Sequence, residues 1–458
     1  MTATLTVAER AGFYLFALTA SLAPLPFGAT DPAVAGVIGT MLGVCLLLAA
    51  LSPRPPGELT GTIWVTLFLS ACVLVWTVVQ AMTPHLTAAA HPLLLAASKH
   101  IAGDAEVPAA VRYPVLLSAG YVLIPLAAFL CALVLVRDDK QYKRFLHILL
   151  GINFFVAAGC IIQFLLAPQT LLWSAKRHYL DAFTGTFINP NTAATQFGVL
   201  LLLALGVSLR QLRKTNLHIH LESGTRSPRE SRNLRMLMAY ALAAFTFLVA
   251  LLLTKSRAGI ISSLAGVVAL VGSFAYFELR RQTSMLRAFG MTALSILAAI
   301  GVFLFLSERL LLRIHDQGLI EPGRVCAFRS TWNAIMDQPW WGTGLGTFQE
   351  IFPAYRTSDC GLTGHWEMAH SVFLEGWLVF GAPFLACAAI AFLELVRIYV
   401  RGTLRRRRYR FSALTCLGIL LLVSLHSLVD FSVQIPGFSV VLAALLGAGV
   451  VVSLRPRT

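Results

Sequence analysis

Long apolar runs separated by short polar breaks make up most of the chain. A helix needs roughly 20 apolar residues to cross a bilayer core about 30 Å thick, so each run of that length predicts one membrane span. The chain contains about twelve such runs, over residues 12–30, 33–51, 61–81, 114–136, 145–166, 191–209, 236–253, 259–277, 289–306, 371–396, 412–434 and 437–454. We therefore predict an all-α polytopic integral membrane protein, with residues 1–458 forming a single integral membrane domain.

One long polar segment, residues 307–370, interrupts this pattern. Within it, apolar residues recur at spacings of three and four, which predicts an amphipathic helix over residues 323–337. The residues in this stripe are Val325, Phe328, Trp332 and Ile335. We interpret residues 307–370 as one long loop that contains short helices.

Composition and charge support this interpretation and add a topology. The chain is 57% hydrophobic and only 12% charged, which excludes an ordinary soluble domain. Its net charge of +15 needs no nucleic-acid partner, because most Lys and Arg residues lie in alternate loops, above all in the basic segments 210–235 and 397–411. The positive-inside rule places these two loops and both termini in the cytoplasm, and residues 307–370 outside. The run Arg405 to Arg408 can also meet anionic membrane lipid.

Two features of the outer segment have more than one interpretation. Cys326 and Cys360 both lie there, and in an oxidising compartment a disulfide between them is as plausible as two free thiols. The glycine-rich stretch Gly342 to Gly346 predicts a turn rather than a phosphate-binding loop, because it follows no predicted strand and lacks the P-loop lysine. The sequence shows no metal-ligand spacing.

Polar residues also gather at the outer ends of predicted helices. Asn189 followed by Pro190 is typical of a helix start, and capping alone would explain both Asn189 and Asn191. Lys255 and Arg257 lie in a tight outer turn, against the positive-inside tendency. Because Arg257 is next to a helix N-terminus, we favour an anion-binding role over that of a simple turn cation.

Ionisable residues inside predicted spans are a further group of candidates. His426, Asp430 and Gln434 are spaced by four residues, so we expect them to stack on one face of the eleventh span. They are either functional or a hydrogen-bonded ladder between helices. Glu375, one turn into the tenth span, has the same two interpretations.

Several motifs, taken together in this order, resemble the O-antigen ligase and Wzy-type polymerase superfamily of bacterial envelope glycosyltransferases. The resemblance covers roughly residues 180–400. The motifs are Asn-Pro-Asn at 189–191, Ser-Arg-Ala-Gly at 256–259, Gly323-Arg324 with Trp332, the glycine-rich stretch from Trp341, and Ala-His-Ser-Val-Phe-Leu-Glu at 369–375.

This resemblance implies a GT-C-like helical enzyme with its active site at the periplasmic face of the inner membrane. The donor would be a glycan on undecaprenyl pyrophosphate. The acceptor would be a sugar hydroxyl of another lipid-linked repeat unit, for a polymerase, or of lipid A core, for a ligase. Residues 426–436 look like members that make exopolysaccharide, which favours a polymerase, an enzyme that can act with a chain-length regulator. By the same resemblance, Arg257 and Arg324 match pyrophosphate-binding arginines, and His370 matches the functional histidine.

The residues fit that chemistry without a metal or cofactor. Arginines offer forked donors to phosphate oxygens as the pyrophosphate leaves, and Lys255, Asn189 and Asn191 would add to this substrate-binding region. His370 is the first candidate for base or orienting partner of the acceptor hydroxyl, with Glu375, His426 and Asp430 in reserve. Direct attack on the anomeric carbon would invert its configuration. A flippase or transporter of lipid-linked sugars is the main alternative, and a non-catalytic assembly partner is a third. A transporter predicts internal repeats and helices broken near the membrane midplane, and the sequence shows no convincing sign of either.

Overall fold

The computed structural model describes residues 7–51, 57–82, 92, 96, 112–213, 228–279, 301, 322–360, 365–407 and 409–455. Within these ranges, 10 helices are long and apolar enough to span a membrane. The prediction of an all-α polytopic membrane protein is confirmed, while the expected span 289–306 lies outside the described residues apart from Gly301. The long helices are α2 (Pro32–Ala50), α3 (Thr60–Met82), α5 (Arg112–Leu135), α6 (Asp139–Leu166), α7 (Pro190–Leu212), α9 (Pro228–Leu253), α10 (Arg257–Leu279), α16 (Ala382–Arg405), α17 (Arg410–Ser427) and α18 (Pro436–Leu454).

Three expected spans differ from the helices observed. The first, over 12–30, is instead α1 (Val7–Leu22), a helix of 16 residues followed by the 3₁₀ turn η1 (Phe27–Ala29). The tenth, over 371–396, breaks at Gly381 into α15 (Val372–Phe380) and α16, because Gly381 has a φ of +74°, which glycine adopts without steric cost.

The eleventh expected span, over 412–434, ends early. Helix α17 stops at Ser427, and the short 3₁₀ turn η5 (Ser432–Gln434) leads into α18. Asp430 accepts a hydrogen bond from the Ser432 amide, a local side-chain contact that competes with helix continuation. The expectation that His426, Asp430 and Gln434 stack on one helix face is therefore wrong.

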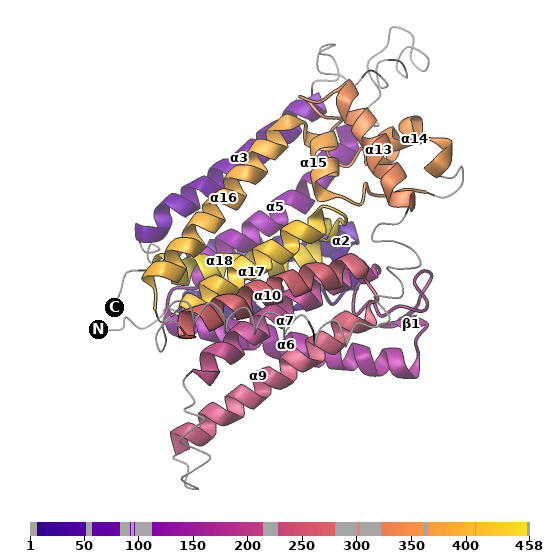
Figure 1. Cartoon of the computed structure of the whole chain (residues 1–458). Helices are drawn as coiled ribbons and strands as arrows, with labels where there is room; N and C mark the ends of the chain where they lie inside the picture. The colour runs from indigo at the N-terminus through magenta and orange to yellow at the C-terminus, as the bar shows by residue number, and fades with distance from the viewer. Residues whose placement is uncertain are drawn as a thin grey trace.

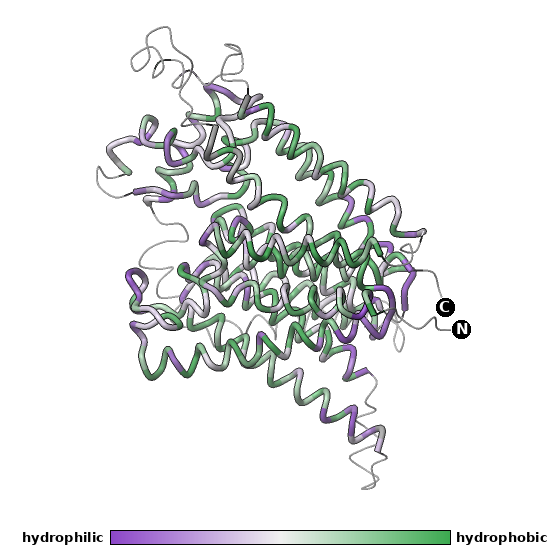
Figure 2. Tube along the Cα trace, turned by 180° about the vertical axis from the view of Figure 1, so that it is seen from behind, coloured by the Kyte–Doolittle hydropathy of each residue, from purple (hydrophilic) through white to green (hydrophobic). Residues whose placement is uncertain are grey.

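The long helices run alongside one another, and the short elements gather at one end (Figure 1). Helices α13 (Pro322–Asp337), α14 (Phe348–Tyr355) and α15 lie at what we call the α13 end, as does the antiparallel pair β1 (Thr170–Leu171) and β2 (Ser174–Ala175). The ends of the described chain lie at the opposite, terminal end. Figure 2 shows the middle of the helices as hydrophobic and both ends as more hydrophilic. Helices α7 and α18 form the centre, since 78% and 89% of their apolar windows are buried.

Small residues bring α7, α10 and α17 close together. A Cβ atom added at Gly259 of α10 would lie 2.5 Å from the Ala194 Cβ of α7, and one at Gly198 would lie 2.2 Å from the Ser263 hydroxyl. Glycine at such positions lets two helix backbones approach, as is common in membrane helix pairs. The N-terminal ends of α7 and α10 are consequently held next to each other.

Residues 322–360 and 365–370 pack as a small unit on α15. Ala327, Ile335, Phe348 and Phe352 belong to its apolar core. The 3₁₀ turn η4 (Ser358–Cys360) brings Cys360 to Cys326, and the structure joins them in a disulfide with Cα atoms 5.4 Å apart.

The predicted apolar face of this segment's helix is partly wrong. Val325 and Trp332 are each 44% exposed. The side of α13 that packs inward carries smaller residues instead, among them Cys326, Ala327 and Ser330. Periodicity found the helix, but the largest apolar side chains do not mark its buried face.

The glycine-rich stretch is a turn. The amides of Thr343 and Gly344 donate hydrogen bonds to the carbonyls of Leu378 and Val379, so they do not point at a ligand. A Cβ atom at Gly342 would lie 2.5 Å from the Gly381 amide nitrogen, so this turn packs directly on the break between α15 and α16.

The two basic segments that we predicted as loops are partly helical. Helix α7 extends to Leu212 and α9 begins at Pro228, within residues 210–235. Helices α16 and α17 leave only residues 406–409 between them, within residues 397–411. A further turn, η2 (Gly57–Leu59), precedes α3.

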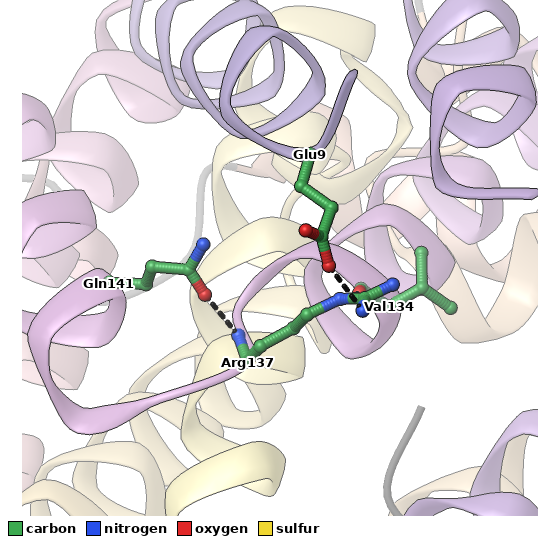
Figure 3. Close-up of polar contacts among 4 residues, drawn as sticks. All are labelled: Glu9, Val134, Arg137 and Gln141. Atoms are coloured by element: carbon green, nitrogen blue, oxygen red, sulfur yellow. Dashed lines mark hydrogen bonds and ion pairs between the residues drawn. The ribbon is translucent and has the colours of Figure 1, made fainter. Parts of the chain in front are cut away.

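A buried ion pair (Figure 3) joins the first turn of α1, at the terminal end, to Arg137, which lies between α5 and α6. Arg137 Nη1 is 2.6 Å from Glu9 Oε1, and their side chains are only 14% and 6% exposed. Arg137 also donates from Nε to the Val134 carbonyl, and its amide donates to Gln141 Oε1. We call Glu9, Arg137 and Gln141 the Glu9 cluster; it ties α1 to the connection between α5 and α6.

Candidate active site

The starts of α7 and α10 are joined by side-chain hydrogen bonds. Asn189 caps α7 by accepting from the Asn191 amide at 2.8 Å. The Ser256 hydroxyl donates to Asn191 Oδ1 at 2.7 Å and accepts from the Gly259 amide of α10. The predicted cap is confirmed, and Asn191 has a structural partner as well.

The two cations of the turn between α9 and α10 have different surroundings. Lys255 has a φ of +57° and pairs with Asp181 at 3.1 Å, an exposed contact that contributes little to stability. Arg257 is the first residue of α10, where free backbone amides and the helix dipole favour an anion. The role of Arg257 in anion binding remains a prediction.

Arg324 links α13 to the end of α17. Its Nη1 donates to the Val429 carbonyl at 3.0 Å, across 105 residues of sequence. The Val429 amide in turn donates to the His426 carbonyl. Arg324 therefore lies over the connection between α17 and α18, residues 428–435.

His370 also lies against this connection. Its ring contacts Phe431, with centroids 5.0 Å apart, and Trp366, with centroids 5.6 Å apart. The backbone of His370 has a φ of +55°, a left-handed conformation that costs energy for a residue other than glycine. Such strain is concentrated at functional sites, so it supports His370 as a candidate.

Glu375 holds the backbone that carries His370. Its carboxylate accepts from the Ala369 amide at 2.7 Å, while Ser371 caps α15. Burial raises the pKa of Glu375 to about 7, although hydrogen bonds from the Ala369 amide and the Gln434 side chain act in the opposite direction.

His426 and Asp430 are connected through two hydroxyl groups. His426 Nδ1 lies 2.6 Å from the Thr195 hydroxyl of α7, which contacts Ser432 Oγ at 2.8 Å, and Ser432 donates to Asp430 Oδ2. Among the residues that the structure describes, no hydrogen-bond partner reaches the buried atoms His426 Nε2 and Asp430 Oδ1. Buried polar atoms without a partner are rare and require an explanation.

The connection 428–435 thus brings most of the predicted site residues together. Its residues contact Arg324 through Val429, His370 through Phe431, Thr195 through Ser432, and Glu375 through Gln434. The Thr195 hydroxyl also lies 3.0 Å from the Asn191 carbonyl, which connects the α7 start to the same group.

Sequence reasoning missed Thr195 and Ser432. Thr195 lies four residues after Asn191 and so on the same face of α7, and Ser432 lies two residues after Asp430. These spacings were the only features of the sequence that could have pointed to Thr195 and Ser432 as site residues. Within the described residues, no three His, Cys, Asp or Glu side chains are placed to hold a metal ion.

This fold and site define a polytopic helical membrane protein whose clustered ionisable residues lie at one end of the helices. A family model described as O-antigen ligase matches residues 242–389, so this region of the chain is similar to the O-antigen ligase and polymerase superfamily. The matched region extends from α9 into α16 and includes Arg257, Arg324, His370 and Glu375, but not His426 or Asp430. No curated protein matches the chain.

Proposed function

We propose that the chain transfers a glycan from undecaprenyl pyrophosphate to an acceptor sugar hydroxyl at the periplasmic face of the bacterial inner membrane, joining repeat units of O-antigen or exopolysaccharide. The observation that carries this proposal is that residues 428–435, which include Asp430, contact Arg324 and His370 directly and His426 through Thr195. An arginine, which can bind phosphate, therefore lies near side chains that can accept a proton. The match to an O-antigen ligase family model supports the same function.

The donor half of the reaction needs neutralisation of a leaving pyrophosphate. Arg324, and Arg257 at the start of α10, provide guanidinium groups that bind phosphate oxygens as charge develops on them. Lys255, Asn189 and Asn191 shape the adjoining helix ends. Because the lipid-linked sugar already carries a good leaving group, these cations are sufficient without a metal ion. Direct displacement at the anomeric carbon then inverts its configuration.

The acceptor half needs one hydroxyl to be oriented and deprotonated. Such positioning and proton transfer each lower the barrier, since a fixed base within hydrogen-bond reach contributes roughly 100- to 10,000-fold. His370 is the first candidate to contact this hydroxyl. Glu375 supports His370 through the Ala369 amide, and His370 contacts Phe431, the residue after Asp430.

A ligase is the second candidate function. The family model that matches residues 242–389 is described as O-antigen ligase, which favours lipid A core as acceptor. The two functions share the donor and differ only in the molecule that supplies the attacking hydroxyl.

Transfer by purified protein tests the proposal. Wild type in nanodiscs would receive an undecaprenyl-pyrophosphate repeat unit with EDTA present, and products would be separated by size. We expect a ladder of longer lipid-linked glycans that is lost in His370→Ala and kept in His365→Ala, a matched change at an exposed histidine of the same segment. Products that form only after lipid A core is added would identify a ligase. Absence of transfer with either acceptor would contradict both functions and favour a transporter.

A further inference from the structure

A chain of buried hydroxyl groups connects His426 with Asp430. Thr195, His426, Asp430 and Ser432 are each at most 3% exposed. Ser432 donates both its amide hydrogen, at 2.9 Å, and its hydroxyl hydrogen to Asp430 Oδ2. The Thr195 hydroxyl is 2.8 Å from Ser432 Oγ and 2.6 Å from His426 Nδ1. We call these four residues the hydroxyl relay.

The number of hydrogens available fixes the direction of the relay. A hydroxyl has one hydrogen to donate, and that of Ser432 goes to Asp430. The Thr195 hydroxyl therefore donates to Ser432, and it must accept from His426. The Asn191 carbonyl is a second possible acceptor at 3.0 Å, but a hydrogen pointing there would leave the Thr195 and Ser432 oxygens facing each other at 2.8 Å with none between them.

This direction determines the tautomer of His426. If Nδ1 carries the hydrogen and donates to Thr195, a neutral imidazole has its lone pair on Nε2. Nε2 is buried, and no group in the described part of the chain forms a hydrogen bond with it. A substrate hydroxyl is a chemically suitable partner for it.

We propose that Thr195 and Ser432 are positioning residues that hold His426 in its Nδ1–H form, so that Nε2 accepts the proton of the attacking sugar hydroxyl. This inference rests on the proposed glycan transfer and assigns its base. As the sugar oxygen bonds to the anomeric carbon, its proton moves to Nε2. The bond from that carbon to the phosphate oxygen breaks, and its electron pair leaves with the pyrophosphate. His370 then orients the acceptor.

The kinetic test removes one hydroxyl at a time. Thr195→Val keeps the side-chain shape and should lower kcat by roughly 10- to 100-fold with little change in KM, because the base is still present but wrongly oriented. Thr195→Ser should restore most of the rate. Thr192→Val is the matched control: Thr192 lies on the same helix, is 1% exposed, and its hydroxyl has no partner among the described residues. Equal losses in Thr195→Val and Thr192→Val would overturn the positioning role.

A second measurement does not depend on activity. Ring-nitrogen chemical shifts of ¹⁵N-histidine-labelled protein report the tautomer of each histidine, and the His426 signal is identified by its loss in His426→Gln. We expect Nδ1–H in wild type and in Thr192→Val, and a shift toward Nε2–H in Thr195→Val and Ser432→Ala. Nε2–H in wild type would overturn the relay. The expected tautomer in a protein that shows no glycan transfer would instead overturn the proposed function and leave the relay standing.

Discussion

The Glu9 cluster and the hydroxyl relay are both buried polar groups in an apolar helix bundle, yet they differ in how fully they are paired. In the Glu9 cluster, Arg137 Nη1 lies 2.6 Å from Glu9 Oε1, and the Arg137 Nε and amide each donate a hydrogen bond to an acceptor (Figure 3). In the relay, His426 Nε2 and Asp430 Oδ1 have no partner within the described residues. Since an unpaired buried polar group costs roughly 1–3 kcal/mol, a stable protein keeps one only for a reason.

We interpret this difference as one between a structural role for the Glu9 cluster and the proposed functional role of the relay. A closed cluster fixes the helices that contribute to it. An open cluster keeps hydrogen-bonding capacity that a substrate can use. Position agrees with this distinction, because the open cluster lies at the α13 end beside Arg324 and His370, and the closed one lies at the terminal end.

The largest effect is expected from breaking the closed cluster. Arg137→Ala removes the cation that lies 2.6 Å from the buried Glu9 carboxylate, which should lower the free energy of unfolding by about 3–5 kcal/mol. Thermal unfolding in detergent would show this as a lower Tm. Arg397→Ala is the control, because Arg397 pairs with Glu394 at the same 2.6 Å but is half exposed. That change should cost about 0–1 kcal/mol. Equal Tm losses would mean that burial does not distinguish the two pairs.

Arg324→Ala should have the next largest effect, on activity rather than on folding. Loss of one preorganised donor to developing negative charge lowers kcat by roughly 100- to 1,000-fold. The glycan-transfer assay measures this. Arg329→Ala changes an exposed arginine of the same helix and should transfer at nearly the wild-type rate. If both variants were equally slow, the net charge of α13 would matter, and the position of Arg324 over Val429 would not.

The architecture could be predicted from sequence because membrane spans depend on length and apolarity alone. The predicted ranges for α2, α7, α10 and α18 overlap closely with the helices observed. Errors arose where a specific packing or hydrogen-bond contact overrides hydropathy. Gly381 breaks an apolar run because it packs on Gly342, and Asp430 ends another by binding the Ser432 amide. Neither contact changes the apolar pattern by which spans are recognised.

The site could be predicted only in part, for a related reason. Arg257, Arg324 and His370 follow from motifs and helix-start chemistry, which are local. The relay requires α7 to lie against the α17–α18 connection, a contact between Thr195 and Ser432 across 237 residues. Threonine occurs inside apolar helices for many structural reasons, so its position in the sequence says little about function until the packing is known.

Glu375 allows a test of pairing by pH. Its pKa of about 7 in the folded protein lies above the usual 4.5. Below that usual value both states hold the proton; between it and about 7 only the folded state does, so stability falls as pH rises and then levels off at a cost of about 3 kcal/mol. Because Gln does not titrate, the difference in Tm between Glu375→Gln and wild type should therefore shift in favour of the variant as the pH rises from 5 to 7. The Tm of Glu367→Gln, at an exposed site in the same segment, should change with pH in parallel with that of wild type. A Tm curve for Glu375→Gln that is also parallel to wild type would contradict the raised pKa of Glu375.

The smallest expected effect tests whether the open cluster depends on close helix packing. In Gly259→Ala the new Cβ would meet the Ala194 Cβ at 2.5 Å, so α7 and α10 must separate, at a cost of about 1–3 kcal/mol. The control Gly151→Ala, in α6, has no atom within 4 Å of the added carbon and should stabilise its helix by about 0.5–1 kcal/mol. Because Ser256 and Asn191 join these two helix starts, Gly259→Ala should also slow glycan transfer at temperatures where it remains folded. A lower Tm with an unchanged rate would show that the close approach of α7 and α10 serves stability alone, and that the open cluster keeps its geometry without it.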